Sequence, residues 1–267
     1  MYKSFYINTP PGAQFIGPPA GQFHLGSSII VASVGLLCKT FLKSCAHFHL
    51  LHPDNMHRLF HRPSHQPVIT YSNHVSTLDD PTIWGAIPTT HLLQRQHMRF
   101  AMAAHDVCFN TSFRTWFFSQ GQCLPVMRGG GVYQGSMNHA VQLLNEGRWV
   151  HIYPEGKVNH VSDEILHFKW GIGRLVMDSL NDTVSPWVVP IYHHGMHDVL
   201  PEHHSLPRLW KTVAIAYGQP MDFRELISAK KAEQASLDTI RAEITRQCYE
   251  RLLQLQKETK HYLSLHS

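Results

Sequence analysis

Hydrophobic and polar positions form short alternating blocks from Pro67 to the C-terminal part of the chain. Six apolar runs are rich in β-branched and aromatic residues, a composition that is typical of strands. They cover residues 68–71, 98–103, 122–127, 149–153, 187–192 and 212–217. Helical patterns separate several of these runs, as in residues 131–147 and 168–180. This alternation predicts an α/β fold with a mainly parallel central sheet flanked by helices.

The C-terminal part of the chain has the pattern of a long amphipathic helix, from about residue 232 to residue 261. Its candidate apolar positions are Ile240, Ile244, Leu252 and Leu255. These positions recur at helical spacing, so we expect the side chains to face the protein core. The sequence contains no internal repeat or long linker, which indicates a single folded domain.

The first 60 residues differ from this pattern. Residues 1–25 are rich in Gly and Pro and predict an irregular arm. The apolar run that follows is interrupted by Lys39, and its uncharged core is shorter than the roughly 20 residues of a membrane span. It fits a helix half-buried in a membrane, a buried core helix, or a signal peptide or true span. We expect the first, which makes residues 26–60 a membrane-associated helical segment and residues 61–267 the α/β domain with its C-terminal helix.

Composition and charge support contact with a membrane. Charged residues make up 16% of the chain, against about 25% in an average soluble domain. The net charge of +4 would help at an anionic membrane surface, but the basic residues are too few and too scattered to favour nucleic acid. The five cysteines have no CxxC spacing, so we expect neither a disulfide framework nor a zinc ribbon.

Candidate chemistry begins in the stretch "YSNHVSTLDDP", residues 71–81. His74 follows a predicted strand, where α/β sheets usually place ligand-binding residues. On a regular helix Asp79 would point about 140° away from His74, so the two side chains can meet only if the residues between them form a turn. Asp80 and Pro81 then predict a helix start, with the aspartate as N-cap and the proline at the first helical position.

A His–Asp pair in a turn has a definite chemistry. The carboxylate fixes the imidazole tautomer, and the other ring nitrogen can take a proton from a hydroxyl group of the substrate. General-base action of this kind is typically worth about 10²–10⁴ in rate. The alternative is a helix-capping loop with a surface histidine, and the spacing alone does not decide between the two.

The same stretch matches the His-x4-Asp motif of the glycerolipid acyltransferases, and three further blocks follow in the order of that family. They are "GQCLPVMRGGG", "VHIYPEGKVN" and "VVPIYHHGMHDVLP". The chain therefore resembles this family over about residues 27–260. Within the family, "HIYPEGKVN", "FKWGIGRL" and "GMHDVLP" are similar to segments of the mitochondrial phospholipid–lysophospholipid transacylases.

The resemblance implies binding roles for residues in these blocks. Arg128 precedes three glycines, and its fork of donors suits a lipid phosphate. Glu155 and Gly156 would belong to the acceptor or phosphate site, where a carboxylate can accept hydrogen bonds from substrate hydroxyls. Lys157 would either add a phosphate contact or be solvated.

The resemblance implies no cofactor and no metal. His193 and His197 have a spacing that would fit one helical face. However, the segment continues a predicted strand and includes Gly195, which argues against a zinc site there.

The function implied by the resemblance is CoA-independent acyl transfer between phospholipids and lysophospholipids, with His74 and Asp79 as the general-base pair. The implied lipids are cardiolipin, monolysocardiolipin and phosphatidylcholine, and the implied location is a mitochondrial membrane, attached without spanning from the intermembrane-space side. Homo-oligomer formation is left open, and no nucleic-acid partner is expected. The alternatives are an acyl-CoA-dependent lysophospholipid acyltransferase, a non-catalytic lipid-binding scaffold and a metal-dependent hydrolase.

Overall fold

The protein is described by a computed structural model that defines residues 25–94, 97–160, 164–181 and 184–266. In these ranges one sheet contains seven strands in the order β1-β7-β6-β2-β5-β3-β4. The strands are β1 (Ala46–Leu51), β2 (Val68–Ser72), β3 (Phe100–Ala104), β4 (Cys123–Val126), β5 (Trp149–Ile152), β6 (Trp187–His194) and β7 (Lys211–Tyr217). Neighbouring strands are parallel, except that β6 and β7 are antiparallel. The carboxyl ends of β6, β2, β5, β3 and β4 therefore lie at one edge of the sheet.

All six predicted strands are present, as β2 to β7, and the mainly parallel α/β fold is confirmed. β1 was missed, because residues 46–51 were expected to belong to a helical segment that extends to residue 60. The helix α1 (Leu25–Cys45) instead ends at Cys45, and β1 pairs in parallel with β7. His47 and His49 interrupt the apolar run and hid the strand pattern. The arm expected for residues 1–25 lies outside the described residues, apart from Leu25 at the start of α1.

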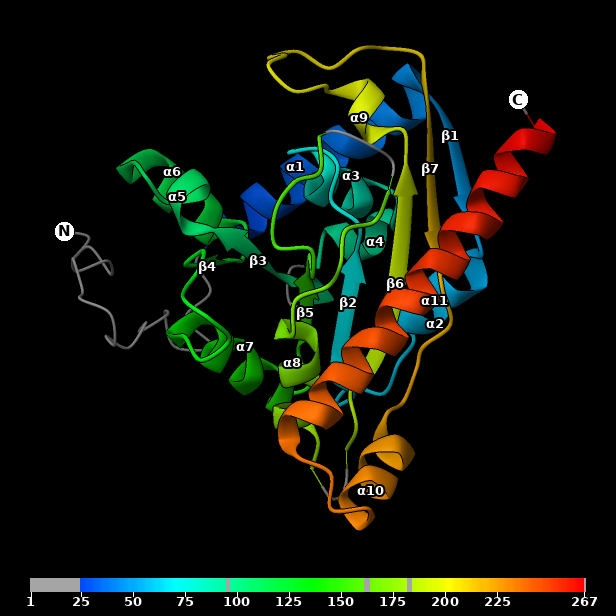
Figure 1. Ribbon diagram of the computed structural model, residues 1–267. Helices are drawn as coiled ribbons and strands as arrows, with labels where there is room; N and C mark the ends of the chain where they lie inside the picture. The colour runs from blue at the N-terminus through cyan, green and yellow to red at the C-terminus, as the bar shows by residue number, and fades with distance from the viewer. Residues whose placement is uncertain (1–24, 95–96, 161–163, 182–183, 267) are drawn as a thin grey trace.

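Side chains alternate between the two faces of the sheet, and helices cover both (Figure 1). Ile69 and Val150 belong to the core under α7, α8, α10 and α11. Val68 and Trp149 belong to the core under α1, α2, α3, α4 and α9. These helices are α2 (Pro53–Phe60), α3 (Asp79–Gly85), α4 (Thr89–Leu92), α7 (Gly135–Asn145), α8 (Gly171–Ser179), α9 (Met196–Val199), α10 (Arg224–Ala232) and α11 (Leu237–His266). Two short helices, α5 (His105–Cys108) and α6 (Ser112–Gln120), lie next to β3 and β4.

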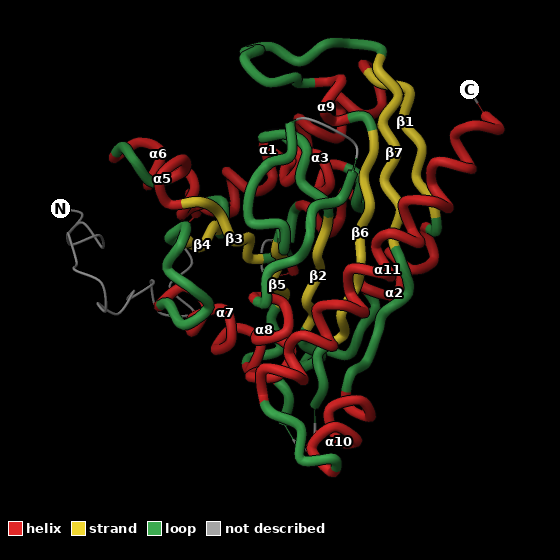
Figure 2. Tube along the Cα trace, viewed as in Figure 1, coloured by secondary structure: helices red, strands yellow, loops and turns green. Residues whose placement is uncertain are grey.

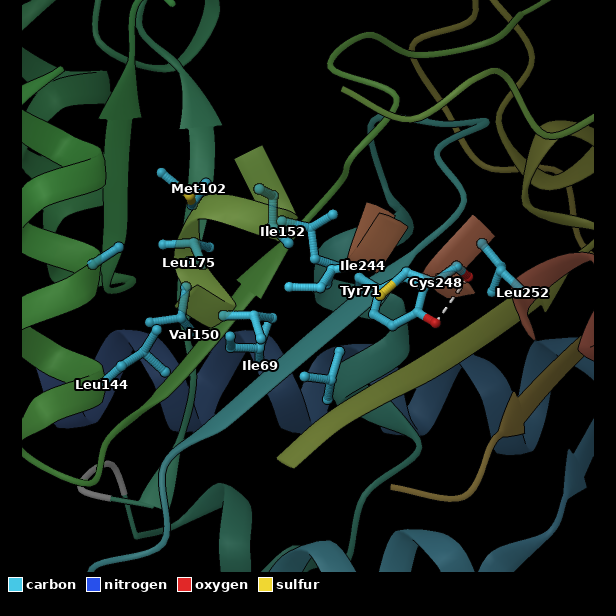
Figure 3. Packing of buried hydrophobic residues seen from close by; sticks show 14 of the residues in the cluster. Ile69, Tyr71, Met102, Leu144, Val150, Ile152, Leu175, Ile244, Cys248 and Leu252 are labelled. Atoms are coloured by element: carbon cyan, nitrogen blue, oxygen red, sulfur yellow. Dashed lines mark hydrogen bonds between the residues drawn. The ribbon is translucent and has the colours of Figure 1, made fainter. Parts of the chain in front are cut away.

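The C-terminal helix α11 holds the strand that leads into the candidate site. Its four predicted apolar positions are fully buried, which confirms the amphipathic pattern (Ile240, Ile244, Leu252 and Leu255). The buried hydroxyl of Tyr71 in β2 donates a hydrogen bond of 2.9 Å to the carbonyl of Cys248 in α11, as Figure 3 shows. Since a buried hydroxyl is costly without a partner, this bond fixes β2 against the helix.

The N-terminal helix α1 is long and apolar enough to cross a membrane, judged by the length and composition of residues 26–45. One side of it packs on the domain, where Val31 and Leu42 join the core. Gly85 in α3 allows close packing, because a Cβ atom there would lie 2.8 Å from backbone atoms of Cys38 and Lys39. Ile29 and Leu37 are more than half exposed on the same helix. The helix therefore has one face for the protein and one apolar face directed away from it.

Candidate active site

The candidate site lies at the edge of the sheet where β2, β5 and β6 end, and loops gather at this edge in Figure 2. His74 lies two residues after β2, and Glu155 lies three residues after β5. His193 is the second-to-last residue of β6. Because parallel neighbours end at the same edge, residues that are about 80 to 120 positions apart in the sequence become neighbours here.

His74 and Asp79 meet, as a turn between them would require. His74 Nδ1 lies 2.8 Å from Asp79 Oδ2, and the backbone N–H of Asp79 donates to the carbonyl of Ser76 to close the turn. Asp79 Oδ2 also accepts hydrogen bonds from the backbone N–H groups of Val75, at 2.7 Å, and Ser76, at 2.8 Å. The Asp79 side chain is fully buried, whereas the His74 side chain is 20% exposed. The carboxylate is thus held in one position by three donors.

This geometry determines which ring nitrogen of His74 carries the proton. An ionised carboxylate can only accept hydrogen bonds, so Nδ1 is the protonated nitrogen and Nε2 has a free lone pair. The ring of Tyr153 stacks on the His74 ring, with centroids 4.1 Å apart and planes inclined by 23°. The imidazole therefore has a fixed tautomer and a fixed plane, which are the requirements for a general base.

The two adjacent aspartates have different partners. We expected Asp80 to be the N-cap of a helix, but α3 begins at Asp79 and its N-cap residue is Leu78. Asp80 instead forms an ion pair with Arg99 and accepts a hydrogen bond of 2.9 Å from Trp84 Nε1. Burial alone would raise the pKa of Asp80, but the charges of Arg99 and His151 and the hydrogen bonds from Trp84 and Arg99 together outweigh it, and the pKa is lowered. The helix begins at Asp79, two residues before the predicted first position Pro81, because the N–H of Thr82 already donates to the carbonyl of Leu78.

Glu155 holds the backbone of His74. Its Oε1 accepts a hydrogen bond of 2.8 Å from the N–H of His74, and its Oε2 accepts one of 2.9 Å from the N–H of Leu166. The carbonyl of His74 accepts a hydrogen bond of 2.7 Å from the N–H of Asn159. Burial raises the pKa of Glu155 to about 7, although the two backbone donors act in the opposite direction. Both Glu155 oxygens are therefore engaged within the protein, and the side chain is 3% exposed.

Asn73 and His193 join the loop that carries His74 to β6. The Asn73 side chain donates to the carbonyl of His193 at 2.9 Å and accepts from its N–H at 3.1 Å. His193 Nε2 lies 2.8 Å from the Asn73 carbonyl and 3.6 Å from Asp79 Oδ2. Since a carbonyl only accepts, Nε2 of His193 carries a proton. The fully buried His193 ring thus donates its Nε2–H to the Asn73 carbonyl, close to the Asp79 carboxylate, and burial lowers the pKa of His193.

Arg128 lies at the same edge of the sheet, two residues after the outermost strand β4. β4 is three places from β2 in the strand order, which corresponds to about 14 Å. The Arg128 guanidinium forms an ion pair of 3.3 Å with Asp106, and both side chains are about half exposed. The loop after it is closed by Gln134, which binds the N–H of Met127 at 2.8 Å and the carbonyl of Gly131 at 2.8 Å. Arg128 is accessible, but the structure does not bring it into contact with His74.

Gly156 and Lys157 form the exposed end of the loop after β5. Gly156 has a φ of +71°, and a Cβ atom there would lie 2.7 Å from Lys169 Nζ. Its N–H donates to the carbonyl of Tyr153 at 3.0 Å and closes a tight turn. The positive φ therefore favours glycine in this turn, which also directs Glu155 toward His74. Lys157 is exposed beside it.

Sequence analysis did not identify Asn73, His193, Tyr153 or Arg99 as parts of this site. Arg99 could have been noticed in the sequence, because a single charged residue at the start of an apolar strand pattern indicates a buried ion-pair partner. The other three are ordinary polar or aromatic residues near strand ends, and their importance depends on neighbours brought together by the sheet. No group of three or more His, Cys, Asp or Glu side chains in the described ranges is arranged to hold a metal ion.

Comparison with known proteins adds to this geometry. Residues 54–194 match the family model described as Acyltransferase. The chain is 36% identical over 245 residues to tafazzin from Drosophila melanogaster, covering 91% of this chain and 64% of that protein. It is 36% identical over 210 residues to N-acylphosphatidylethanolamine synthase from Arabidopsis thaliana, covering 75% of this chain and 73% of that protein.

A solved structure has the same overall fold. The 1-acyl-sn-glycerophosphate acyltransferase PlsC from Thermotoga maritima superposes with a TM-score of 0.54 at 16% sequence identity. The similarity covers 84% of this chain and 78% of PlsC. It confirms the predicted arrangement of a mainly parallel sheet between helices.

Proposed function

This chain belongs to the acyltransferase family and is a relative of the tafazzins, and we propose that it is a CoA-independent phospholipid–lysophospholipid transacylase. In this proposal it moves acyl chains from phospholipids such as phosphatidylcholine to lysophospholipids, and it forms cardiolipin from monolysocardiolipin. The chain spans 64% of the length of Drosophila tafazzin. The observation that supports the proposal most strongly is the 2.8 Å contact between His74 Nδ1 and Asp79 Oδ2.

In the proposed mechanism His74 is the general base. Its Nε2 takes the proton from the free hydroxyl of a lysophospholipid, and the oxygen attacks the ester carbonyl of a second phospholipid. Asp79 stabilises the imidazolium that forms. The imidazolium then returns the proton to the departing oxygen, which leaves as the hydroxyl of a new lysophospholipid. One ester bond is formed and one is broken, so the exchange needs no external source of energy.

The substrate-binding roles extend this proposal to neighbouring residues. Arg128 binds a phosphate of one of the lipids, and its distance from His74 suits a large lipid or the second of two lipids. Glu155 and Gly156 shape the loop that carries His74, and Lys157 adds a positive charge next to it. Glu155 acts through the backbone of His74, because both of its oxygens accept protein N–H groups.

We further propose that α1 holds the protein on a mitochondrial membrane, facing the intermembrane space, without spanning the bilayer. α1 packs on α3, the helix whose first residue is Asp79. A spanning orientation would have to remove Val31 and Leu42 from the core. The exposed side chains of Leu37 on α1 and Phe113 on α6, a helix that contacts α1, are available to the acyl region of the membrane.

Two alternative acyl-transfer activities would use His74 as the base in the same way. An acyl-CoA-dependent lysophospholipid acyltransferase would differ in the acyl donor. The Arabidopsis relative is named as an N-acylphosphatidylethanolamine synthase, so a second candidate activity is transfer to the amine of phosphatidylethanolamine. Attack by an amine also requires loss of a proton, which the same Nε2 atom of His74 would accept.

One assay separates these activities. The purified protein is added to liposomes that contain acyl-labelled phosphatidylcholine and either monolysocardiolipin or phosphatidylethanolamine, with or without unlabelled acyl-CoA. Label in cardiolipin without CoA is the expected result. Label in N-acylphosphatidylethanolamine would identify the amine as acceptor. Formation of cardiolipin solely in the samples that contain acyl-CoA, with no label transferred from phosphatidylcholine, would contradict CoA-independent transfer.

A further inference from the structure

A group of basic side chains lies at the edge of the sheet opposite to His74. It is formed by the end of α2, the segment that leads into β2, the helix α4 and the segment between α4 and β3. We call these residues the basic cluster: His57, Arg58, His61, Arg62, His91 and His97. The rings are neighbours, with centroid distances of 6.4 Å for His57 and His61, 6.3 Å for His61 and His91, and 6.4 Å for His91 and His97.

The electrostatic surroundings of the basic cluster are positive. Burial lowers the pKa of His91, and repulsion from the neighbouring histidines and Arg62 lowers it further. Burial lowers the pKa of His97, and Arg62 and Arg148 act in the same direction. Burial and the charge of Arg148 also lower the pKa of Arg62 to about 10.

The acids on the surrounding elements do not compensate this charge. Asp54 in α2 precedes His57 by three positions and Arg58 by four, but no ion pair joins it to either residue in the described part of the chain. Glu146 lies two residues before Arg148. Within the described part of the chain, the ion pairs formed by carboxylates involve residues outside the basic cluster. Six basic side chains without an ion-paired carboxylate in the described ranges favour binding of an anion.

A hollow beside the basic cluster has room for such an anion. It has a volume of about 450 Å³ and is lined by Arg58, His61, Trp187, Gln219 and Pro220. His61 Nδ1 lies 2.9 Å from the carbonyl of His57, which only accepts, so Nδ1 carries a proton. Nε2 is then the nitrogen available to a ligand. It becomes a hydrogen-bond donor only when His61 gains a second proton.

We propose that this hollow binds a phosphate group, through Arg58, His61 and the side-chain amide of Gln219, and that binding strengthens as the pH falls. The phosphate group belongs either to a free phosphate anion or to a lipid headgroup. Arg58 supplies a permanent charge, whereas the histidines supply charge and donors when protonated. The bound anion would also relieve the repulsion among the neighbouring histidines. This proposal does not depend on the acyl-transfer function.

The test uses sulfate, because its charge stays constant over the pH range in which histidine titrates. Thermal unfolding of the full chain is measured with sulfate or with chloride at equal ionic strength. We expect sulfate to bind about fivefold more tightly at about pH 5.5 than at about pH 7.5. The double variant Arg58→Gln/His61→Gln should lose this stabilisation. The matched control is Arg208→Gln/His204→Gln, which removes another exposed Arg–His pair, 2.9 Å apart, outside the basic cluster.

A second arm identifies the source of the phosphate group. Sedimentation with phosphatidylcholine vesicles, with and without phosphatidylglycerol, measures the part of membrane binding that depends on anionic lipid. If the Arg58→Gln/His61→Gln variant loses the binding that depends on phosphatidylglycerol while the control variant keeps it, and sulfate does not stabilise the wild type, the phosphate group belongs to a lipid headgroup. Circular dichroism without sulfate establishes that both double variants are folded. Equal responses of the two folded variants to sulfate and to phosphatidylglycerol would overturn the proposal.

Discussion

Replacement of Asp79 by Asn or by Ala separates two contributions of this carboxylate, its hydrogen bonds to the His74 loop and its negative charge. Asp79 Oδ2 accepts from His74 Nδ1 and from two backbone N–H groups, at 2.7 to 2.8 Å. Oδ1 is buried and has no hydrogen-bond partner among the described residues. In Asp79→Asn the amide oxygen can take the Oδ2 position and the NH₂ group the Oδ1 position. All three donors and the His74 tautomer would be kept, while the negative charge is lost.

The two variants should lose different amounts of unfolding free energy. A hydrogen bond to a charged acceptor is worth about 1 kcal/mol more than one to a neutral acceptor, and removal of a buried charge offsets part of this loss. We therefore expect Asp79→Asn to lose about 1–2 kcal/mol of unfolding free energy. Asp79→Ala leaves two buried N–H groups without a partner at about 1–3 kcal/mol each, so a loss of about 2–6 kcal/mol is expected. Either variant should lower the rate by about 10²–10⁴, because the imidazolium is no longer stabilised.

Urea unfolding and the liposome assay test these expectations on the same preparations. The expected pattern is an Asp79→Asn protein that is nearly as stable as the wild type and strongly impaired in acyl transfer. Transfer at the wild-type rate by Asp79→Asn would refute the role of the charge. An Asp79→Asn protein as unstable as Asp79→Ala would refute the inferred position of the amide oxygen.

Three further substitutions test the surroundings of the site. Burial raises the pKa of Glu155 from 4.5 to about 7, so the folded state keeps a proton that the unfolded state releases, and wild-type stability falls as the pH rises through this window. The stability loss in Glu155→Gln should therefore shrink by up to about 3 kcal/mol between about pH 4.5 and pH 8 in urea titrations, and a loss that is independent of pH would contradict this. Asn73→Ala removes both hydrogen bonds to the His193 backbone and should cost about 2 kcal/mol together with at least a tenfold lower kcat; an unchanged kcat would argue against the positioning role. Gly85→Ala places a Cβ atom 2.8 Å from the backbone of Cys38 and should lower the free energy of unfolding by about 1–3 kcal/mol through overpacking. If the substitution displaces α1, less protein should sediment with vesicles. Unchanged stability would show that α1 can shift to make room for the methyl group.

The local pattern was sufficient for most of the fold, because most strands are buried on both faces. Residues 149–152, for example, are buried without exception, so the run is continuously apolar apart from His151. β1 lacks this property, since its side chains are mostly partly exposed and two of them are histidines. A strand at the end of a sheet needs less apolar surface, and its pairing with β7 depends on residues about 165 positions away.

The candidate site was predictable where the relevant partners are close in sequence. The spacing of His74 and Asp79 led to the turn that the structure contains. The hydrogen bonds of Glu155 and His193 could not be predicted in the same way, because their partners belong to other strands. The strand order that brings them together is determined by packing of the whole sheet, and a local pattern does not contain it. The different partners of Asp79 and Asp80 likewise depend on Arg99, which arrives with β3.

The most direct test of the account is acyl transfer by a His74→Gln variant in liposomes without CoA. Gln keeps a polar side chain of similar size but cannot act as a base. The matched control is His203→Gln, at a side chain that is 88% exposed and outside the site. We expect label to pass from phosphatidylcholine to monolysocardiolipin with the wild type and the control, and the rate to fall by about 10²–10⁴ with His74→Gln. Transfer at the control rate by a folded His74→Gln protein would contradict the claim that His74 is the catalytic base.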